Sequence, residues 1–250
     1  MAVWRYDGTF SGFLTVCATL VSSGEEPEAI VSGMEHQNNL FSPTVIVESD
    51  DLLADKMLAA IAARMSSDSC RLLLQAFLSE TAGMELLLWR YLSFGRNAGA
   101  KTDRFLAHPA VAPVHRLAHA VDHEAHRVKG VIRFQESAGG YWYAAITPAY
   151  QVLELIAPHF ADRCADMKWL IHDRHRNLAV AWNGTEWRVS DFDAVGTPCL
   201  SANEGQWSEL WRVYFAGIAI LERLNRRLQR QHLPERFRSF LTEMTRPSSH

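Results

Sequence analysis

The sequence lacks paired cysteines, long apolar runs and a large net charge, and each absence excludes a class of protein. Cys17, Cys70, Cys164 and Cys199 lie far apart and form no CxxC pair, which argues against a zinc ribbon or a self-contained iron–sulfur cluster. No apolar run approaches the roughly 18 residues that suggest a membrane span. The formal net charge of -3 excludes a uniformly basic nucleic-acid coat but is compatible with a local basic patch.

We therefore expect a globular, cytoplasmic protein with no membrane contact and no bound cofactor or metal. The first residues place Arg5 and Asp7 before a short apolar stretch, without the small-residue cleavage site of a secretory signal. Scattered cysteines are typical of buried thiols in a reducing compartment. With 250 residues, of which 48% are apolar and 21% charged, the chain is large enough to bury a sizeable core.

The pattern of apolar residues predicts an α+β fold, in which several long helices pack on a mostly antiparallel sheet. Hairpins are expected near 131–147 and near 168–190, where the segments SAGG and Asn183-Gly184 supply the turns. We predict one domain over residues 1–250.

Two parts are expected within that domain. Residues 1–112 combine helices and strands, and residues 113–250 hold the hairpins and the C-terminal helices. Strands are predicted at VWRY and TVIVES, with mostly loop over 22–43 between them. Asp7 or Thr9 is suited to cap the helix that follows the first strand.

The segment VDHEAHRVKGVIRFQE belongs to a predicted helix that begins after Pro113 and ends at Gly130. On a helical wheel, one flank is apolar and faces the core: Val114, Leu117, Ala118, Val121, Ala125 and Val128. The opposite flank carries His115, His119, His123 and His126. His119 and His123 have a spacing that two ligands of one metal ion can use, but a solvated helix face explains them more simply.

A cluster of cations follows on the same stretch. His126, Arg127 and Lys129 lie near the end of the predicted helix, and Arg133 lies on the next strand. The helix macrodipole favours cations at such a position, which accounts for Arg127 and Lys129 without any ligand. The addition of His126 and Arg133 favours a site for phosphate or another anion.

His172 and Asp173 end an apolar, strand-like run. A rigid sheet positions such residues and a loop exposes them, so the pair is suited to act as a general base or a metal ligand. The alternative is a polar hairpin loop in which Asp173 binds local backbone.

The C-terminal region has the clearest charge pattern. Between 212 and 246, eight arginines accompany three glutamates. Arginine pairs with phosphate in planar geometry, so we select Arg226, Arg227 and Arg230 as candidate nucleic-acid contacts. A solvated face or a surface for a protein partner is the alternative.

The same region predicts a long amphipathic helix from 204 to 230. Its apolar stripe is expected to be buried: Trp207, Leu210, Trp211, Tyr214, Ile218 and Leu221.

Four blocks of the sequence, spread in order over nearly the whole chain, resemble the bacterial "probable DNA metabolism protein" family. They are YDGTFSGFL, EAHRVKGVIRFQE, APHFADR with WLIHDRHR, and LWRVYF with ERLNRRLQRQHLPERF. The defining domain of that family has no known function. The resemblance implies a setting of DNA repair or modification, with a radical-SAM protein encoded alongside that holds the iron–sulfur chemistry. It also implies kinship with domains fused to uracil-DNA-glycosylase-like domains.

The resemblance also selects residues. The family pattern falls on Asp7, Gly8, Phe10, Glu124, His126, Arg127, Lys129, Gly130, Arg133, Phe134, His159, Phe160, Arg163, Trp169, His172, Asp173, Arg176, Arg223, Asn225, Gln229 and Pro234. The sequence departs from the pattern after Pro234, where Arg236-Phe237-Arg238 replaces an expected aromatic pair. With the basic cluster above, this adds Arg163 and Arg176 to the candidate phosphate contacts.

Three hypotheses follow. The first is a DNA-repair or DNA-modification accessory protein that binds single- or double-stranded DNA and works with a radical-SAM partner. The second is an enzyme that acts on a nucleic-acid lesion or a phosphoester with His126, His172 and Asp173. The third is a module that binds only protein. We favour the first.

Overall fold

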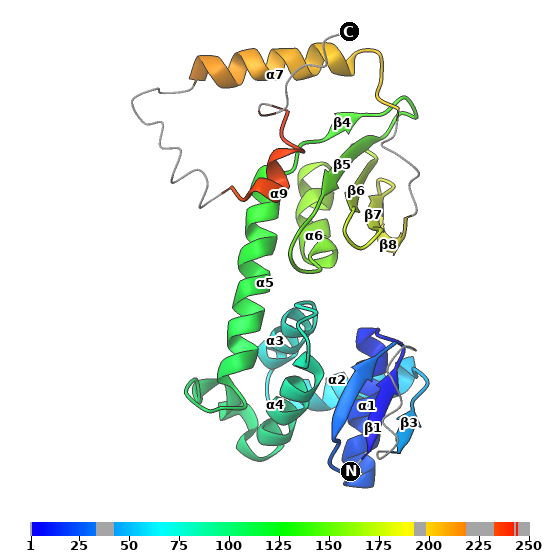
Figure 1. The fold of residues 1–250 in the computed structure, drawn as a ribbon, viewed down its shortest axis with the longest axis vertical. Helices are drawn as coiled ribbons and strands as arrows, with labels where there is room; N and C mark the ends of the chain where they lie inside the picture. Colours follow the sequence, from blue (N-terminus) through cyan, green and yellow to red (C-terminus); the bar gives the residue numbers. More distant parts are fainter. Residues whose placement is uncertain (1, 34–42, 193–198, 219–232, 243, 245–250) are drawn as a thin grey trace. The chain divides into compact units, whose positions relative to one another are not determined.

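The computed structural model divides the chain into two compact units, residues 1–122 and residues 123–250, each with its own β-sheet (Figure 1). The structure describes residues 2–33, 43–192, 199–218, 233–242 and 244. The fold is α+β, as the sequence predicts. The expectation of a mostly antiparallel sheet is only partly right, because one sheet is parallel and the other is mixed.

The first unit contains a three-stranded parallel sheet with the order β2-β1-β3. Its strands are β1 (Val3–Tyr6), β2 (Ala29–Ser32) and β3 (Thr44–Ile46). The first and third occur where the sequence predicts them. β2 falls inside the segment predicted to be mostly loop, so that prediction is wrong there. A helix connects β1 to β2, and such a crossover brings two strands together in parallel.

The helices of the first unit begin at residues whose side chains cap them. Thr9 accepts a hydrogen bond from the Gly12 amide at the start of α1, and Asp50 accepts one from the Leu53 amide at the start of α2. Both caps agree with the sequence pattern. The helices are α1 (Phe10–Ser23), α2 (Asp51–Arg64), α3 (Ser67–Phe77), α4 (Met84–Ala98) and a 3-10 helix (Gly99–Arg104).

One hydrophobic core holds this unit together. Phe13 of α1, Leu73 of α3 and Leu88 of α4 are each fully buried, and the ring of Phe13 contacts that of Phe77. Burying a side chain of this size contributes about 1.5–3 kcal/mol. Gly83 has φ of 76° and lies between α3 and α4.

The division between the units falls within α5 (Ala112–Val131). The predicted core flank is confirmed, since Val114, Ala118, Val121, Ala125 and Val128 are at most 2% exposed. The predicted end at Gly130 is wrong, because the helix continues through this residue to Val131. Gly130 does not have the positive φ of a helix-ending glycine among the described residues.

The second unit contains a five-stranded sheet with the order β4-β5-β6-β7-β8. The strands are β4 (Gln135–Glu136), β5 (Trp142–Ile146), β6 (Trp169–Asp173), β7 (Leu178–Trp182) and β8 (Trp187–Asp191). Antiparallel pairing of β4 with β5, of β6 with β7, and of β7 with β8 confirms both predicted hairpins. The first is short because α5 occupies the residues before it.

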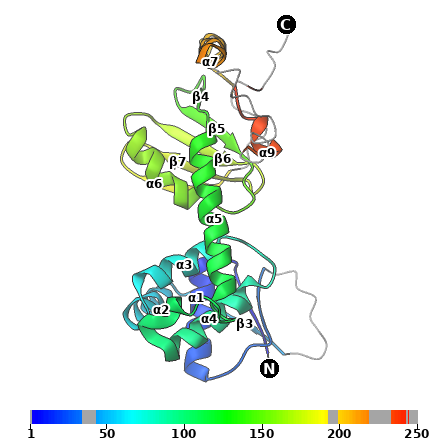
Figure 2. The same cartoon turned by 90° about the vertical axis from the view of Figure 1, so that its left-hand side faces the viewer.

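β5 and β6 are parallel. The helix α6 (Leu153–Arg163) connects them and lies alongside the sheet in Figure 2. Pro158 lies within this helix. Phe160 of α6 packs against Trp169, so this helix covers the sheet face that carries Trp169 and Ile171. Because side chains alternate along a strand, His172 lies on the other face.

Two helices follow in the C-terminal part, α7 (Glu204–Ile218) and α9 (Glu235–Arg238). The stripe predicted to be buried is largely exposed, since Trp207, Leu210 and Tyr214 are 57%, 59% and 57% exposed. That prediction is wrong for these residues, because no described part of the second unit packs over that side of α7. Ile218 and Leu221 lie outside the described side chains. Among the described helices, none is long and apolar enough to cross a lipid bilayer.

Candidate functional site

The second unit contains a polar cavity of about 310 Å³ on the sheet face opposite α6. Its lining comes from the segment after α5, the strands β4 and β5, the end of β6, and the segment after α9. The lining residues are Arg133, Gln135, Tyr143, Ala145, Arg174, Ser239, Phe240 and Thr242. A volume of about 300 Å³ or more is typical of small-ligand sites.

Two arginines give the cavity its charge. Arg133 is held by hydrogen bonds from Nη1 to the carbonyl of Ile132 at 3.1 Å and by its position over the Trp211 ring, 5.3 Å from the ring centre. Arg174 directly follows β6, and its amide donates to the carbonyl of Ile146 at 3.0 Å. The Arg174 backbone is therefore fixed to the sheet, and both arginine side chains line the same space.

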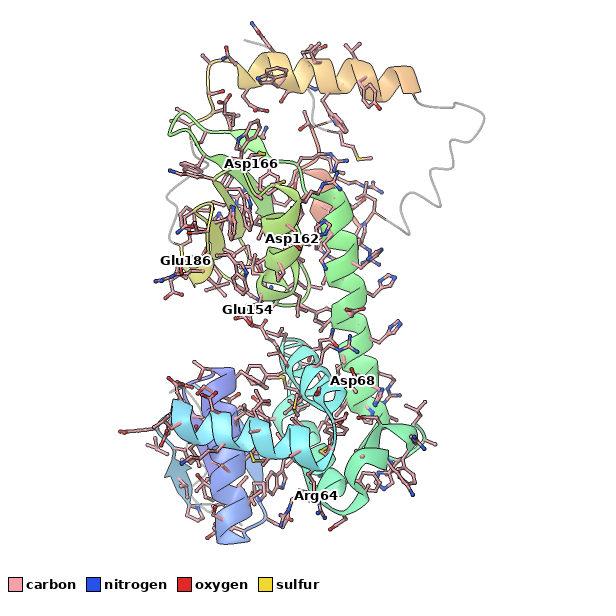
Figure 3. All side chains as sticks on the ribbon, turned by 180° about the vertical axis from the view of Figure 1, so that it is seen from behind. Arg64, Asp68, Glu154, Asp162, Asp166 and Glu186 are labelled. Carbon is pink, nitrogen blue, oxygen red and sulfur yellow. The ribbon has the colours of Figure 1, made fainter. Side chains whose placement is uncertain are left out.

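No carboxylate is among the described residues that line this cavity. The acidic side chains Glu154, Asp162 and Asp166 are exposed on and just after α6, which covers the other face of the sheet (Figure 3). Two guanidinium groups without a competing carboxylate favour an anion in the cavity. The sheet thus separates these three carboxylates from the two arginines of the cavity.

The wall of the cavity continues into the sheet through Tyr143 and His172. The Tyr143 hydroxyl and His172 Nδ1 share a hydrogen bond of 2.9 Å. His172 is 4% exposed, and its Nε2 has no hydrogen-bond partner among the described residues. Burial lowers the pKa of His172, and the nearby Arg174 lowers it further, against a smaller opposing effect of Asp173. The imidazole is therefore neutral at pH 7.

Asp173 faces away from this cavity and stabilises the fold. It is fully buried, and its carboxylate accepts from Arg176 Nη1 at 2.9 Å and from the His175 amide at 3.0 Å. Arg176 also donates to the carbonyls of Pro148 and Ala149. The ion pair thereby joins the end of β6 to the segment after β5.

Glu124 is the centre of a second buried network. Its carboxylate accepts from Arg127 Nη1 at 2.8 Å, from Arg236 Nη2 at 2.8 and 3.1 Å, and from the Ala149 amide at 2.9 Å. The side chain of Glu124 is 3% exposed. This carboxylate fixes α9 and the segment after β5 to α5. Two of the residues selected by the resemblance, Glu124 and Arg127, therefore hold the fold together.

The remaining candidates do not line the cavity. His126 and Arg163 are exposed, and Lys129 is half-buried. Arg226, Arg227 and Arg230 lie outside the described residues. Of the proposed catalytic trio, the structure places His172 behind the cavity, Asp173 on the opposite face, and His126 on the surface of α5.

The histidine flank of α5 is largely exposed, as its wheel predicts. His119 and His123 both lie at the surface, and Arg127 Nη2 lies 3.3 Å from His123 Nδ1. Within the described part of the chain, no group of three or more histidine, cysteine, aspartate or glutamate side chains is placed to hold a metal ion.

Sequence reasoning missed several lining residues, among them Gln135, Tyr143, Arg174 and Phe240. A signal for Arg174 was present, because it follows His172 by two positions, and alternation along a strand places both on one face. Tyr143 gave no such signal, because the sequence did not predict that its strand, β5, pairs in parallel with β6, which carries His172.

Residues 82–243 match the family described as a domain of unknown function, DUF4130. The match covers more than half of the chain. The chain belongs to the DUF4130 family. No curated protein matches it. All eight residues that line the polar cavity fall within the DUF4130 match, so the cavity is a feature of the matched region.

Proposed function

We propose that this DUF4130 protein is a nucleic-acid-binding accessory protein of DNA repair or modification, which works with a radical-SAM partner. The resemblance described above supports the setting and the partner. The observation that carries the nucleic-acid part is the cavity in which Arg133 and Arg174 converge without a carboxylate in the described lining.

The chemistry of the lining is suited to one nucleotide of a strand. Arg133 and Arg174 supply the cations that pair with a phosphate. Phe240 supplies aromatic surface on which a base can stack, and stacking contributes about 1–3 kcal/mol per base. Gln135 supplies an amide that can bind a base edge. Arginine and aromatic side chains together are typical of sites for single-stranded nucleic acid.

Fluorescence anisotropy with labelled single- and double-stranded oligonucleotides tests this proposal. The variants are Arg133→Gln and Arg174→Gln, and the matched control is Arg188→Gln, an exposed arginine of β8 in the same unit. A lost charge-assisted hydrogen bond costs about 1.5–3 kcal/mol, so each cavity variant should bind roughly tenfold or more weakly. The proposal fails if Arg188→Gln weakens binding as much, or if the wild-type chain binds neither oligonucleotide with or without its partner.

The partner is tested separately. We expect co-purification with the radical-SAM protein to survive nuclease treatment, because an accessory subunit contacts its partner directly. Association that disappears with nuclease would mean that DNA bridges the two proteins, and would remove the partner from the proposal.

A second function, enzymatic action on a nucleic-acid lesion or phosphoester, is favoured by the Tyr143–His172 hydrogen bond at the cavity wall. A neutral His172 can accept a proton that the Tyr143 hydroxyl relays from a bound substrate. In this case Tyr143→Phe and His172→Gln abolish turnover of a damaged oligonucleotide while the affinity for it stays within about threefold. Loss of affinity together with turnover, or no turnover in the wild type, would leave only the binding function.

A further inference from the structure

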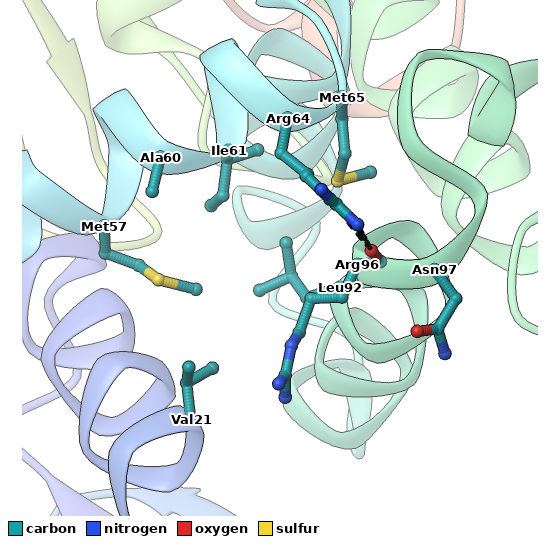
Figure 4. Close-up of a pocket in the computed structure, with 9 residues that line it drawn as sticks. All are labelled: Val21, Met57, Ala60, Ile61, Arg64, Met65, Leu92, Arg96 and Asn97. Carbon is teal, nitrogen blue, oxygen red and sulfur yellow. Dashed lines mark hydrogen bonds between the residues drawn. The ribbon is translucent and has the colours of Figure 1, made fainter.

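A second cavity, of about 410 Å³, lies entirely within the first unit, between α1, α2 and α4 (Figure 4). Its walls are mostly apolar and include Val21, Met57, Ile61 and Leu92. Two arginines, Arg64 of α2 and Arg96 of α4, complete the lining, and no carboxylate is among its described residues. The proposed nucleic-acid function does not use this cavity.

A glycine of α4 shapes one side of the cavity. Gly95 is buried, and a Cβ at this position would collide with the side chain of Met65. Because Gly95 has no side chain, Met65 can lie against α4 and form part of the wall. Met57 and Met65 give this wall the flexible, polarisable surface that adapts to flat rings and alkyl chains.

The two arginines have different roles. Arg64 donates from Nε and Nη2 to the backbone carbonyl of Arg96, at 3.0 and 2.8 Å. It therefore satisfies a carbonyl in the last turn of α4, where a cation is favoured by the helix dipole. These hydrogen bonds account for the position of the Arg64 side chain without any ligand.

The same explanation does not cover the side chain of Arg96. In a helix, long side chains lean toward the N-terminus over the residue four positions earlier, and Arg96 lines the cavity together with Leu92. Its guanidinium makes no hydrogen bond or ion pair with the residues that the structure describes. An apolar molecule with one negative group can place its apolar part in such a cavity and its negative group on the exposed cation beside it.

We propose that this cavity binds a small amphipathic anion, with an aromatic or alkyl body against Met57, Ile61 and Leu92 and a carboxylate, sulfonate or phosphate on Arg96. A site of this size takes a ligand of two or three rings. Electrostatic attraction to Arg96 adds to the burial of the apolar body, so an anion binds more tightly than a neutral molecule of the same shape.

The test uses two dyes with the same ring system, 8-anilinonaphthalene-1-sulfonate and the neutral N-phenyl-1-naphthylamine. Both are titrated into the full chain, and the methyl resonances of Met57 and Met65 report whether they enter the cavity. We expect the sulfonate to bind once per chain, to shift both methyl signals, and to bind about tenfold or more tightly than the neutral dye.

Three variants locate the site. Arg96→Gln should weaken the sulfonate about tenfold or more and leave the neutral dye within twofold. Ala60→Trp, which places a large ring in the lining, should block both dyes. The control Arg90→Gln changes an exposed arginine of the same helix outside the cavity lining and should change neither. Circular dichroism and the melting temperature establish that each variant is folded.

The proposal is overturned if the two dyes bind equally, if Arg96→Gln leaves the sulfonate unaffected, or if the methyl signals of Met57 and Met65 do not move. Sedimentation of the free chain provides a further check. A dimer that dissociates when the dye binds would show that a second copy covers the cavity, and would also overturn it.

Discussion

Each unit contains a carboxylate that joins several segments, and the two carboxylates have different partners. In the first unit, Asp103 accepts hydrogen bonds from Ser69 Oγ at 2.6 Å and from the Tyr91 hydroxyl at 2.8 Å, and lies 2.9 Å from His115 Nε2. In the second unit, Glu124 is surrounded by two arginines and a backbone amide. The first carboxylate has hydroxyls and an imidazole as partners, whereas the second forms ion pairs.

This difference teaches how each unit depends on charge. A buried ion pair is costly to break, because the remaining charge loses its partner in a poorly solvated place. Hydroxyl partners leave no uncompensated charge when the carboxylate is neutralised. The second unit, which holds the proposed nucleic-acid cavity, therefore depends more on its arginines and carboxylates than the first.

The largest effect is expected from Glu124→Gln. It leaves Arg127 and Arg236 without their carboxylate, and breaking a buried pair of this kind costs about 3–5 kcal/mol. Because Arg236 is partly exposed, the lower end of that range is expected. Native-state hydrogen exchange should show faster opening of β5 and β6, with α1 and α4 unchanged. If hydrogen exchange became faster by the same factor in both units, the result would contradict the comparison.

A smaller effect is expected from Asp103→Asn in the first unit. The amide keeps one acceptor oxygen, but its NH2 group opposes donors that the second oxygen accepts, at a cost of about 1–3 kcal/mol. Hydrogen exchange should accelerate in α3 and α4 and stay unchanged in β5 and β6. If Asp103→Asn lowers the free energy of unfolding more than Glu124→Gln does, then the first unit depends more on its carboxylate than the second, which contradicts the comparison.

The pH dependence of the second unit should follow His172. Its pKa is lowered from 6.5 by burial, so the unfolded chain takes up this proton at a higher pH than the folded chain. Stability from this residue is present above about pH 6.5 and is lost as the pH falls below it. The stability of the second unit is measured by urea unfolding at pH 7.5 and 5.5, with hydrogen exchange in β6 as the readout. The loss of stability between the two pH values should be smaller for His172→Gln than for the wild type. An equal difference would show that His172 does not cause it.

The smallest effect is expected at the surface pair of Arg71 and Asp68 in α3. Both side chains are mostly exposed, at 66% and 79%, and such pairs contribute about 0–1 kcal/mol. Arg71→Ala should therefore lower the free energy of unfolding of the first unit by less than about 1 kcal/mol. A loss above 2 kcal/mol would show that Arg71 makes a further contact.

Much of the fold could be predicted from local patterns. The cap at Thr9, the apolar flank of α5 and the turn at Asn183-Gly184 each depend on a few neighbouring residues, and each is confirmed. The parallel strand pairs could not be predicted by treating neighbouring strands as hairpins. Strand direction depends on the connection, and a helix lies between β5 and β6.

The site was harder to predict for a related reason. Its lining comes from segments more than 100 residues apart, such as Arg133 and Phe240, and no local pattern shows that they meet. The charge pattern selected Arg133, which lines the cavity, as a candidate, but it gave the same weight to Arg127 and Arg176, whose guanidinium groups pair with Glu124 and Asp173. The sequence shows where cations lie along the chain, whereas the packed fold decides which of them form ion pairs with buried carboxylates.

The central claim is that Arg133 and Arg174 of the second unit contact phosphate. The decisive measurement is the salt dependence of single-stranded DNA affinity for the wild type and for the Arg133→Gln/Arg174→Gln double variant. The two arginines pair with one phosphate, so their loss should lower the slope of log affinity against log salt by about 0.7, the value for one contact on a single strand. An unchanged slope, whatever the change in affinity, would contradict the claim.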